Sequence, residues 1–233
     1  MSFRFRVFND FVALFYPRLC LACEYHIPPR DQVICISCQY QLPKTKFHLE
    51  RENAFTQRFW GRVPVDAGAA LYHFTKSSKT QQLIHQLKYQ GKRQVGIQLG
   101  QLYGKALKAS PYFEKVERII PVPLHPRKQK IRGFNQSAQF AQGLSESMQI
   151  PWSENNLIRT TMSESQTQKS RMDRFANVQA AFQVKNEKEI SGKHLLLVDD
   201  VMTTGATLEA CALQLLKVDG VKVSMATIAI AQQ

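Results

Sequence analysis

The sequence predicts an α/β fold with a doubly wound, mainly parallel β-sheet, preceded by a small cysteine-rich module. Three observations support this. Short apolar runs lie near residues 119, 157, 195 and 222, and helix-bearing segments separate them. The last run, over 221–231, is almost continuously apolar, as in a strand buried on both faces. Four of the five cysteines fall in two close pairs before residue 40. Strands that alternate with helices form parallel sheets, whose ligands bind beyond the carboxyl ends of the strands.

The elements expected in chain order follow from hydrophobic periodicity and from helix start and stop residues. They are a strand over 67–74, helices over 79–89 and 95–108, a strand over 118–122, a helix after Asn135, strands over 157–161, 178–184 and 195–198, a helix over 206–216 and a strand over 221–231. Gly91 ends the first helix, and Asn135 is a favourable N-cap for the helix that follows it.

The first sixteen residues contain an apolar run over 11–16 that is too short for a signal peptide or a bilayer-spanning helix. Phe8, Phe11, Val12 and Phe15 share one helical face. We expect a short amphipathic helix that docks on the body of the protein, and contact with a membrane surface is the alternative. With no integral membrane segment in the sequence, a cytoplasmic location is expected.

The most informative stretch covers residues 195–207. An apolar run is followed by Asp199 and Asp200, then by a short loop rich in hydroxyl side chains, then by a helical pattern. A loop that opens a helix offers free backbone N–H groups and the positive end of the helix dipole to an anion. Gly205 lets the backbone approach that anion closely. The Gly-Lys-Ser/Thr ending of a Walker A loop is missing. Two carboxylates beside a phosphate-binding loop favour a sugar phosphate.

These residues resemble the signature of type I phosphoribosyltransferases, which bind 5-phosphoribosyl-1-pyrophosphate (PRPP). The resemblance implies a sheet of that kind and a catalytic pair, Asp199 and Asp200, that would orient the ribose hydroxyls and magnesium. The implied PRPP-binding residues are Asp199, Asp200, Val201, Met202, Thr203, Thr204, Gly205, Ala206 and Thr207. In the alternative, the two acids simply end a buried strand in a solvated turn.

The cysteines form two Cys-x-x-Cys pairs, Cys20 with Cys23 and Cys35 with Cys38, with eleven residues between the pairs. Two such pairs can close a tetrahedral thiolate site, for which zinc is the expected metal. Four thiolates leave no open position for a substrate, so the predicted role of zinc is structural. A module of this size cannot build its own core, so metal binding would supply much of its folding energy.

The formal net charge is +13, and it is unevenly distributed. Residues 63–118 carry nine basic against three acidic side chains, whereas residues 175–233 carry five against six. A small phosphorylated ligand does not require so broad a positive field, so a polyanion such as single-stranded DNA is a plausible partner. A solvated basic surface without specific meaning is the alternative.

A basic loop is expected between His125 and Phe134, where four basic residues occur without an acid. It could hold pyrophosphate, a nucleic-acid backbone or no ligand at all. The candidate contact residues are Lys88, Arg127, Lys130 and Arg132. The aromatic residues Phe134, Tyr89 and Trp60 lie beside basic residues and are candidates for stacking on bases, or else belong to the core.

The whole chain resembles the ComF family, whose members have a phosphoribosyltransferase fold and are linked to natural competence. The resemblance is carried by the cysteine pairs, the acid-and-loop motif, and the runs over 87–93, 132–136 and 166–182. It implies a zinc module over residues 1–62 and a phosphoribosyltransferase-like domain over 63–233. It also implies a PRPP site and a link to the uptake of transforming DNA, but it does not settle the activity. The expected partners are PRPP, single-stranded DNA because of the charge, and the DNA-uptake machinery.

Three readings of the function stay open. The protein could bind both PRPP and DNA, it could be a phosphoribosyltransferase with an unidentified acceptor and no nucleic-acid role, or PRPP could regulate binding without turnover. In an enzyme, residues 163–174 could close over the site. Catalysis would then consist mainly of charge stabilisation and positioning.

Overall fold

A computed structural model describes residues 17–160 and 181–232. The amphipathic helix expected within residues 1–16 and the closing loop expected over 163–174 both lie outside the described residues. The helices and strands in chain order are α2 (Ile36–Gln41), η1 (Phe47–Leu49), η2 (Thr56–Phe59), β1 (Gly68–Phe74), α3 (Lys79–Tyr89), α4 (Arg93–Lys108), β2 (Arg118–Pro121), α5 (Pro126–Arg132), α6 (Gln136–Met148), β3 (Leu157–Arg159), β4 (Phe182–Val184), α8 (Glu187–Ile190), β5 (His194–Met202), α9 (Ala206–Leu215) and β6 (Lys222–Ala231).

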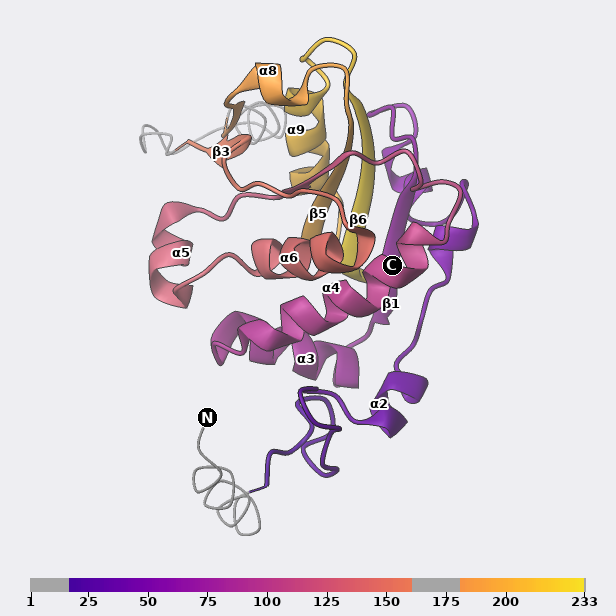
Figure 1. The fold of residues 1–233 in the computed structure, drawn as a ribbon, viewed down its shortest axis with the longest axis vertical. Helices are drawn as coiled ribbons and strands as arrows, with labels where there is room; N and C mark the ends of the chain where they lie inside the picture. Colours follow the sequence, from indigo (N-terminus) through magenta and orange to yellow (C-terminus); the bar gives the residue numbers. More distant parts are fainter. Residues whose placement is uncertain (1–16, 161–180, 233) are drawn as a thin grey trace.

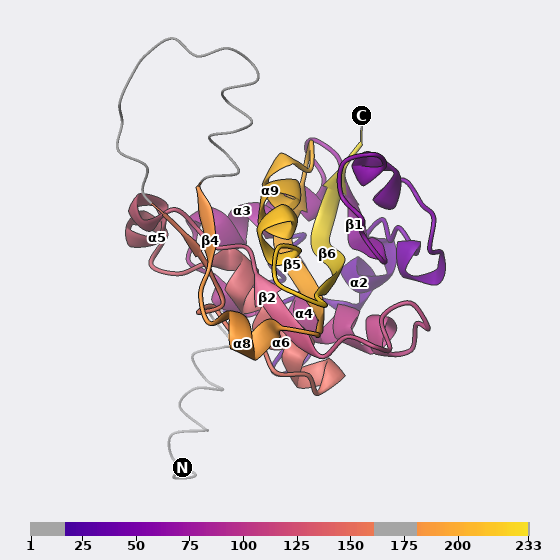
Figure 2. The ribbon, with the colours of Figure 1, turned by 90° about the horizontal axis from the view of Figure 1, so that it is seen from above.

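The central sheet has the strand order β1-β6-β5-β2, and all three neighbouring pairs are parallel. The predicted parallel α/β sheet is therefore confirmed. The strands run in one direction through the middle of the molecule, so their carboxyl ends meet at one edge (Figures 1 and 2). Asp199 pairs with Thr227 in the register of β5 and β6, which places the two acids close to that edge.

The strand expected near residue 157 does not belong to the central sheet, so this part of the prediction is wrong. β3 instead pairs antiparallel with β4 in a separate two-stranded sheet. Beside β2, the chain that leads to β3 makes only an isolated bridge, from Trp152 to Ile119. A strand of three residues in which Leu157 alone is buried has too little apolar surface to extend a sheet that is covered on both faces.

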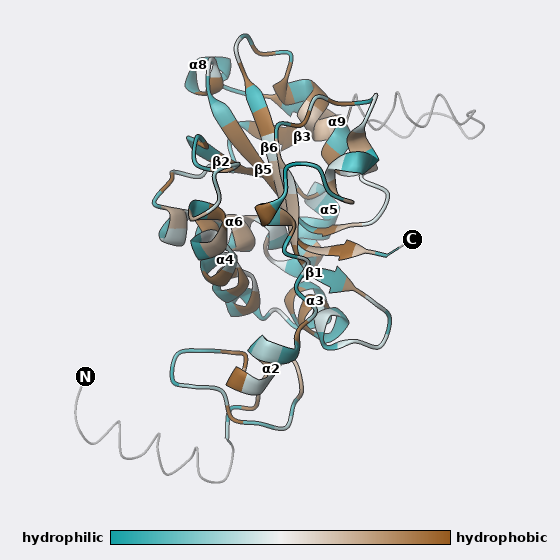
Figure 3. Cartoon of the chain, turned by 90° about the vertical axis from the view of Figure 1, so that its right-hand side faces the viewer, coloured by the Kyte–Doolittle hydropathy of each residue, from teal (hydrophilic) through white to brown (hydrophobic). Residues whose placement is uncertain are grey.

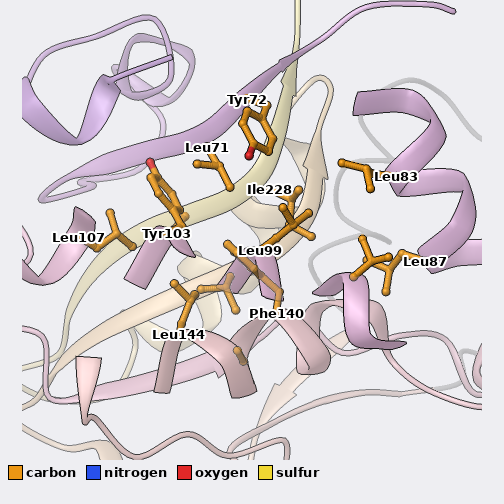
Figure 4. Close-up of a cluster of buried hydrophobic side chains, with 14 of the residues drawn as sticks. Leu71, Tyr72, Leu83, Leu87, Leu99, Tyr103, Leu107, Phe140, Leu144 and Ile228 are labelled. Carbon is orange, nitrogen blue, oxygen red and sulfur yellow. The ribbon is translucent and has the colours of Figure 1, made fainter. Parts of the chain in front are cut away.

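Helices cover both faces of the central sheet because alternate residues of its strands are apolar on each side. Along β5, Leu196 and Val198 pack in one buried cluster with residues of α3, α4 and α6, whereas Leu195 and Leu197 pack in a second cluster with residues of α9. Figure 4 shows part of the first cluster, and Figure 3 shows brown, apolar stretches on the central strands and on α4, which covers one face of the sheet.

Helices α4 and α6 approach each other closely along a row of glycines on α4. A Cβ atom on Gly100 would lie 2.4 Å from the Phe140 carbonyl oxygen, and one on Gly143 would lie 2.0 Å from the Ile97 carbonyl oxygen. Backbone contact of this kind excludes any larger residue. This close packing fixes the position of α6 against α4, and therefore the position of the first turn of α6 at the edge of the sheet.

The basic segment after β2 is a helix rather than the loop that we expected. Pro126 occupies the first turn of α5, where a missing N–H costs nothing, and the ring of His125 accepts a hydrogen bond from the Arg127 backbone N–H at 3.2 Å. Gly133, with φ of +75°, ends the helix in a left-handed cap. The basic side chains are therefore presented on a short helix.

Candidate functional site

The two acids stand at the carboxyl end of β5, and the loop that follows them leads directly into α9. Gly205 has φ of +83° and is the N-cap of α9, so the chain can turn sharply from strand to helix. A small cavity of about 40 Å³ lies in this turn. It is lined by Asp199, Val201, Met202, Thr203, Thr204, Gly205, Ala206, Thr207 and Leu208. We call Asp199 and Asp200 the acid pair, and residues 203–207 the anion loop.

The structure therefore brings together the predicted acid pair and the predicted loop. Thr203, Thr204 and Thr207 are exposed, so their hydroxyl groups are accessible to a ligand. Met202 is different, because its side chain is buried and only its backbone can contact a ligand. That any of these residues binds PRPP stays a prediction.

Asp199 is held by the first turn of α6. Its Oδ1 accepts hydrogen bonds from the Ser137 hydroxyl at 2.7 Å and from the Asp200 backbone N–H at 2.8 Å. Burial, reinforced by the neighbouring Asp200 carboxylate, raises the pKa of Asp199 to about 7, and the two hydrogen bonds only partly oppose this. A carboxyl group held poised near neutrality at a strand end is typical of a functional site.

Asp200 is held by α3. Its Oδ1 lies 2.8 Å from Lys88 Nζ, and both side chains are largely buried. A buried carboxylate needs such a partner, because an unpaired charge would be strongly destabilising. Lys88, predicted as a pyrophosphate or nucleic-acid contact, is thus adjacent to the acid pair.

The α3–α4 turn, residues 88–93, is also joined to the segment after α5. The Arg132 guanidinium lies 5.5 Å from the centre of the Tyr89 ring, and the Arg93 guanidinium lies 4.9 Å from the centre of the Phe134 ring. Arg93 Nη2 also donates to the Gly133 carbonyl at 3.0 Å. Two runs that are far apart in the sequence, 87–93 and 132–136, therefore interlock beside the acid pair.

The predicted basic contact residues are placed differently. Arg132 donates to the Gln136 side chain at 2.8 Å and is half-buried. Arg127 and Lys130 are exposed on α5. Of the aromatic candidates, Phe134 is buried and belongs to the core, whereas Tyr89 and Trp60 are 65% and 59% exposed.

A further part of the site comes from η2, which the sequence analysis had assigned to the separate amino-terminal module. An Arg58 guanidinium nitrogen donates to the Thr203 carbonyl of the anion loop, and another donates to the Ala231 carbonyl at 2.5 Å. The Phe59 ring lies against Gly205, where a Cβ atom would be 3.1 Å from a ring carbon. We call Arg58 and Phe59, together with Arg62, the brace.

Arg62 completes the brace through a buried carboxylate. Its Nη1 lies 2.5 Å from Glu209 Oε2 in the first turn of α9, and the Glu209 side chain is 2% exposed. The guanidinium thereby compensates an acid close to the anion loop. No local signal in the sequence marks these residues, because the hydrogen bonds of Arg58 and Arg62 join positions 145 to 173 residues apart in the chain.

The four predicted zinc ligands also converge. The sulfur atoms of Cys20, Cys23, Cys35 and Cys38 all lie within 4.8 Å of one another. Backbone N–H groups donate to these sulfurs, from Cys35 to Cys20 Sγ at 3.3 Å and from Cys38 to Cys35 Sγ at 3.5 Å. Such a cluster of four thiols could hold a tetrahedral metal ion, and zinc is the metal that it suits best.

The cysteine cluster packs beside α3 and α4. The Val33 backbone N–H donates to Gln98 Oε1 at 2.6 Å, and Gln82 Nε2 donates to Glu24 Oε1 at 2.7 Å. Between the module and the α3–α4 turn lies a groove of about 800 Å³. Its charged lining residues are Arg18, Asp31, Lys92 and Arg93.

Residues 17–160 and 181–232 contain no helix that is both long enough and apolar enough to span a bilayer.

Comparison with known proteins gives a consistent result. Residues 130–233 match the family described as the phosphoribosyl transferase domain. The DNA utilization protein YhgH of Escherichia coli O157:H7 is 34% identical over 138 residues, or 58% of this chain and 60% of that protein. Competence protein F of Haemophilus influenzae is 35% identical over 130 residues (54% and 57%), and competence protein ComFC of Bacillus subtilis is 34% identical over 106 residues (46% and 41%).

The chain thus spans about 60% or less of the length of these relatives. Among solved structures, glutamine PRPP amidotransferase of B. subtilis matches with a TM-score of 0.39 and 21% identity, over 56% of this chain and 26% of that one. Together, the relatives named for competence and DNA utilization, the phosphoribosyl transferase domain over residues 130–233 and the amino-terminal four-cysteine cluster agree with the predicted resemblance to the ComF family.

Proposed function

We propose that the protein binds PRPP with magnesium at the acid pair and the anion loop, binds single-stranded DNA on its basic surface, and acts in the uptake or use of transforming DNA. The observation that carries the PRPP proposal is the acid pair itself, which stands beside a helix-opening loop with a buried lysine at 2.8 Å from one carboxylate. The names of the relatives, DNA utilization protein and competence protein, support the role in DNA handling.

The chemistry of the site fits a phosphorylated ribose. Exposed threonine hydroxyls and the free N–H groups at the start of α9 would hold the 5′-phosphate. The carboxylates would accept hydrogen bonds from the ribose hydroxyls, and carboxylate oxygens are also ligands that Mg²⁺ prefers. Magnesium would supply charge neutralisation on the pyrophosphate. Arg58 fixes the loop through the Thr203 carbonyl, so the loop backbone is positioned before the ligand arrives.

Lys88 would exchange partners when the ligand binds. In the structure it neutralises Asp200. Once ribose hydroxyls and a cation engage that carboxylate, the Lys88 ammonium is free to interact with a pyrophosphate oxygen. The ion pair with Asp200 satisfies both charges before a ligand binds, and the same lysine would then contact the bound ligand.

The DNA proposal rests on charge and on exposed aromatic rings. The groove beside the cysteine cluster carries Arg18, Lys92 and Arg93 against a single acid, Asp31. Tyr89 lies two residues before Gly91, which lines this groove. Its ring is 65% exposed, and the Arg132 guanidinium lies 5.5 Å from the ring centre. Cationic grooves that border exposed aromatic rings are typical of surfaces that track a single strand and stack its bases.

A structural zinc ion is proposed for the cysteine cluster. Three of its four cysteines are buried, and the sulfurs of two of them, Cys20 and Cys35, accept backbone hydrogen bonds, as sulfur ligands of a structural metal do. Because residues beside these cysteines, between Arg18 and Val33, form one wall of the basic groove, zinc would organise the groove without contacting DNA.

We predict that Asp200→Asn, and separately Asp199→Asn, abolishes binding of magnesium-PRPP while DNA affinity changes less than twofold, because the acids would contact only the sugar phosphate. Isothermal titration calorimetry and DNA anisotropy measure the two affinities. Asp219→Asn, at an exposed acid between α9 and β6, is the control and should change neither. Loss of both affinities in a folded variant would show that one site serves both ligands.

The raised pKa of Asp199 predicts a pH-dependent penalty on stability in the ligand-free protein. Between the ordinary pKa of 3.8 and the folded value of about 7, the unfolded chain has lost the proton and the folded chain has kept it, so stability falls as pH rises and stays lower above pH 7. Asp199→Asn removes this penalty. Thermal melts should show an increase in Tm of about 2–4 °C per kcal/mol removed at pH 8, and none near pH 4. An equal shift at both pH values would contradict this origin.

For DNA, we predict that Lys92→Gln weakens binding and lowers the slope of log affinity against log salt by about 0.7, as expected for one lost phosphate contact on a single strand. Tyr89→Ala should cost about 1–3 kcal/mol without changing that slope, because stacking is not electrostatic. Anisotropy of labelled DNA at two salt concentrations measures both effects. Lys217→Gln, on α9's carboxyl side, is the control, and no binding at either salt would refute the DNA proposal.

For zinc, we predict one ion per chain by mass spectrometry of the purified protein, and its loss in Cys20→Ser. Removal should lower Tm, because the module depends on the metal for folding energy, and should weaken DNA binding through loss of the groove wall. Cys211→Ala, at a buried position of α9, should keep the full zinc content. Zinc retained at one ion per chain in Cys20→Ser would contradict the assignment of this ligand.

A further inference from the structure

A groove of about 760 Å³ lies between α2, η1 and α4, where the cysteine module meets the body of the protein. Among the described residues, its lining shares no member with the acid pair, the anion loop or the basic groove beside the cysteine cluster. The lining is mainly apolar and includes the outward side of α2. We call it the α2 groove.

Three large apolar side chains are exposed in the α2 groove. Ile36 is 63% exposed, Tyr40 86% and Leu49 59%. The cysteine cluster explains the first two, because Cys38 is buried in the cluster and its backbone N–H donates to Cys35 Sγ, which orients α2. Ile36 and Tyr40, four residues apart, lie on the helix face opposite Cys38. A group of exposed apolar side chains in one groove is typical of an interaction site.

Lysine side chains surround this apolar surface. Lys44, Lys46 and Lys105 line the groove and are exposed. Among the described residues, none that lines the groove is acidic, and none of these lysines forms an ion pair or a side-chain hydrogen bond. The groove therefore combines an apolar surface with uncompensated positive charge, and the ligand that complements it is both apolar and acidic.

The floor of the groove contains two polar atoms without a partner. The Tyr103 hydroxyl and His48 Nδ1 are both buried, and neither makes a hydrogen bond within the described part of the chain. Their rings meet edge-on, with 5.8 Å between ring centres. Figure 4 shows the Tyr103 hydroxyl directed away from Phe140 and Leu144 in the core. Buried polar groups are normally hydrogen-bonded, so the floor is a place where another molecule could supply a missing partner.

We propose that the α2 groove binds an acidic amphipathic helix of a partner protein. In this mode of recognition, apolar side chains at helical spacing fill a groove, and charged side chains beside them meet its rim. The apolar face of the partner helix would pack on Ile36, Tyr40 and Leu49. Its Asp and Glu side chains would pair with the lysines at the rim, which would fix the orientation of the helix.

Two other occupants fit the groove less well. The first sixteen residues of this chain have an apolar face, but they carry Arg4 and Arg6 against Asp10, so the lysines would repel them. Single-stranded DNA would satisfy the lysines, but Ile36 and Leu49 are aliphatic and offer no ring on which a base can stack.

The test selects ligands for the full, zinc-loaded chain from a phage library of short helical peptides of unbiased composition. We expect the enriched peptides to carry net negative charge and an apolar face. Leu49→Ser and Lys105→Glu should each weaken the binding of such a peptide by about tenfold or more, measured by fluorescence anisotropy. The control is Lys188→Glu, at an exposed position of α8 at the other end of the molecule, and it should leave that affinity unchanged (Figure 1).

All three substitutions are at exposed positions, so an unchanged Tm shows that each variant is folded. The inference is overturned if no peptide is enriched, if the enriched peptides lack acidic residues, or if they bind the groove variants as tightly as the original protein. Sedimentation that reveals self-association, abolished in Leu49→Ser, would show that a second copy fills the groove instead. A loss of DNA affinity in Lys105→Glu, without any bound peptide, would assign these lysines to nucleic acid.

Discussion

The ion pair between Lys88 and Asp200 determines how the parts of this site are arranged. Two adjacent carboxyl groups at the end of a buried strand are unfavourable unless a cation lies against them, because an uncompensated charge in that position costs several kcal/mol. Lys88, in the last turn of α3, fulfils this condition because its Nζ lies 2.8 Å from Asp200 Oδ1. The end of α3 must therefore remain at the edge of the sheet, and the chain that follows it must turn there.

The turn at that position links the acid pair to the basic side of the molecule. Directly after Lys88, Tyr89 lies under the Arg132 guanidinium, and a few residues later Arg93 covers Phe134. The same turn forms one wall of the groove beside the cysteine cluster. A change at the acid pair and a change in the groove therefore act on one short segment. This arrangement offers a physical route by which a sugar phosphate and a polyanion could influence each other.

Local signals were sufficient for much of this architecture. The bounds of α3 and the order of strand, acids, loop and helix around Asp199 follow from periodicity and from Gly205, and the convergence of the cysteines follows from their spacing. The exclusion of β3 from the central sheet could not be predicted, since pairing depends on which edge is free in three dimensions. Helix α5 was missed because the run of basic residues concealed a start at Pro126 and a stop at Gly133.

The brace was beyond local reasoning for a different reason. Arg58 and Phe59 resemble ordinary surface and core residues, and only the folded chain brings them to the anion loop. The amino-terminal segment consequently does more than carry the four-cysteine cluster, because its η2 helix contacts the same loop that would hold a phosphate. The raised pKa of Asp199 likewise could not be predicted locally, because it depends on burial by residues that are distant in the sequence.

The Arg58 contacts have a consequence for how the molecule fluctuates. The Arg58 guanidinium joins the amino-terminal segment to the anion loop and to the end of β6. Local unfolding of any one of these three segments therefore breaks hydrogen bonds to the others. Amide protons in the anion loop should then exchange with solvent in step with those of the amino-terminal segment, as a single cooperative unit. The rigidity of the anion loop would thus depend on a residue that lies 145 positions earlier in the chain.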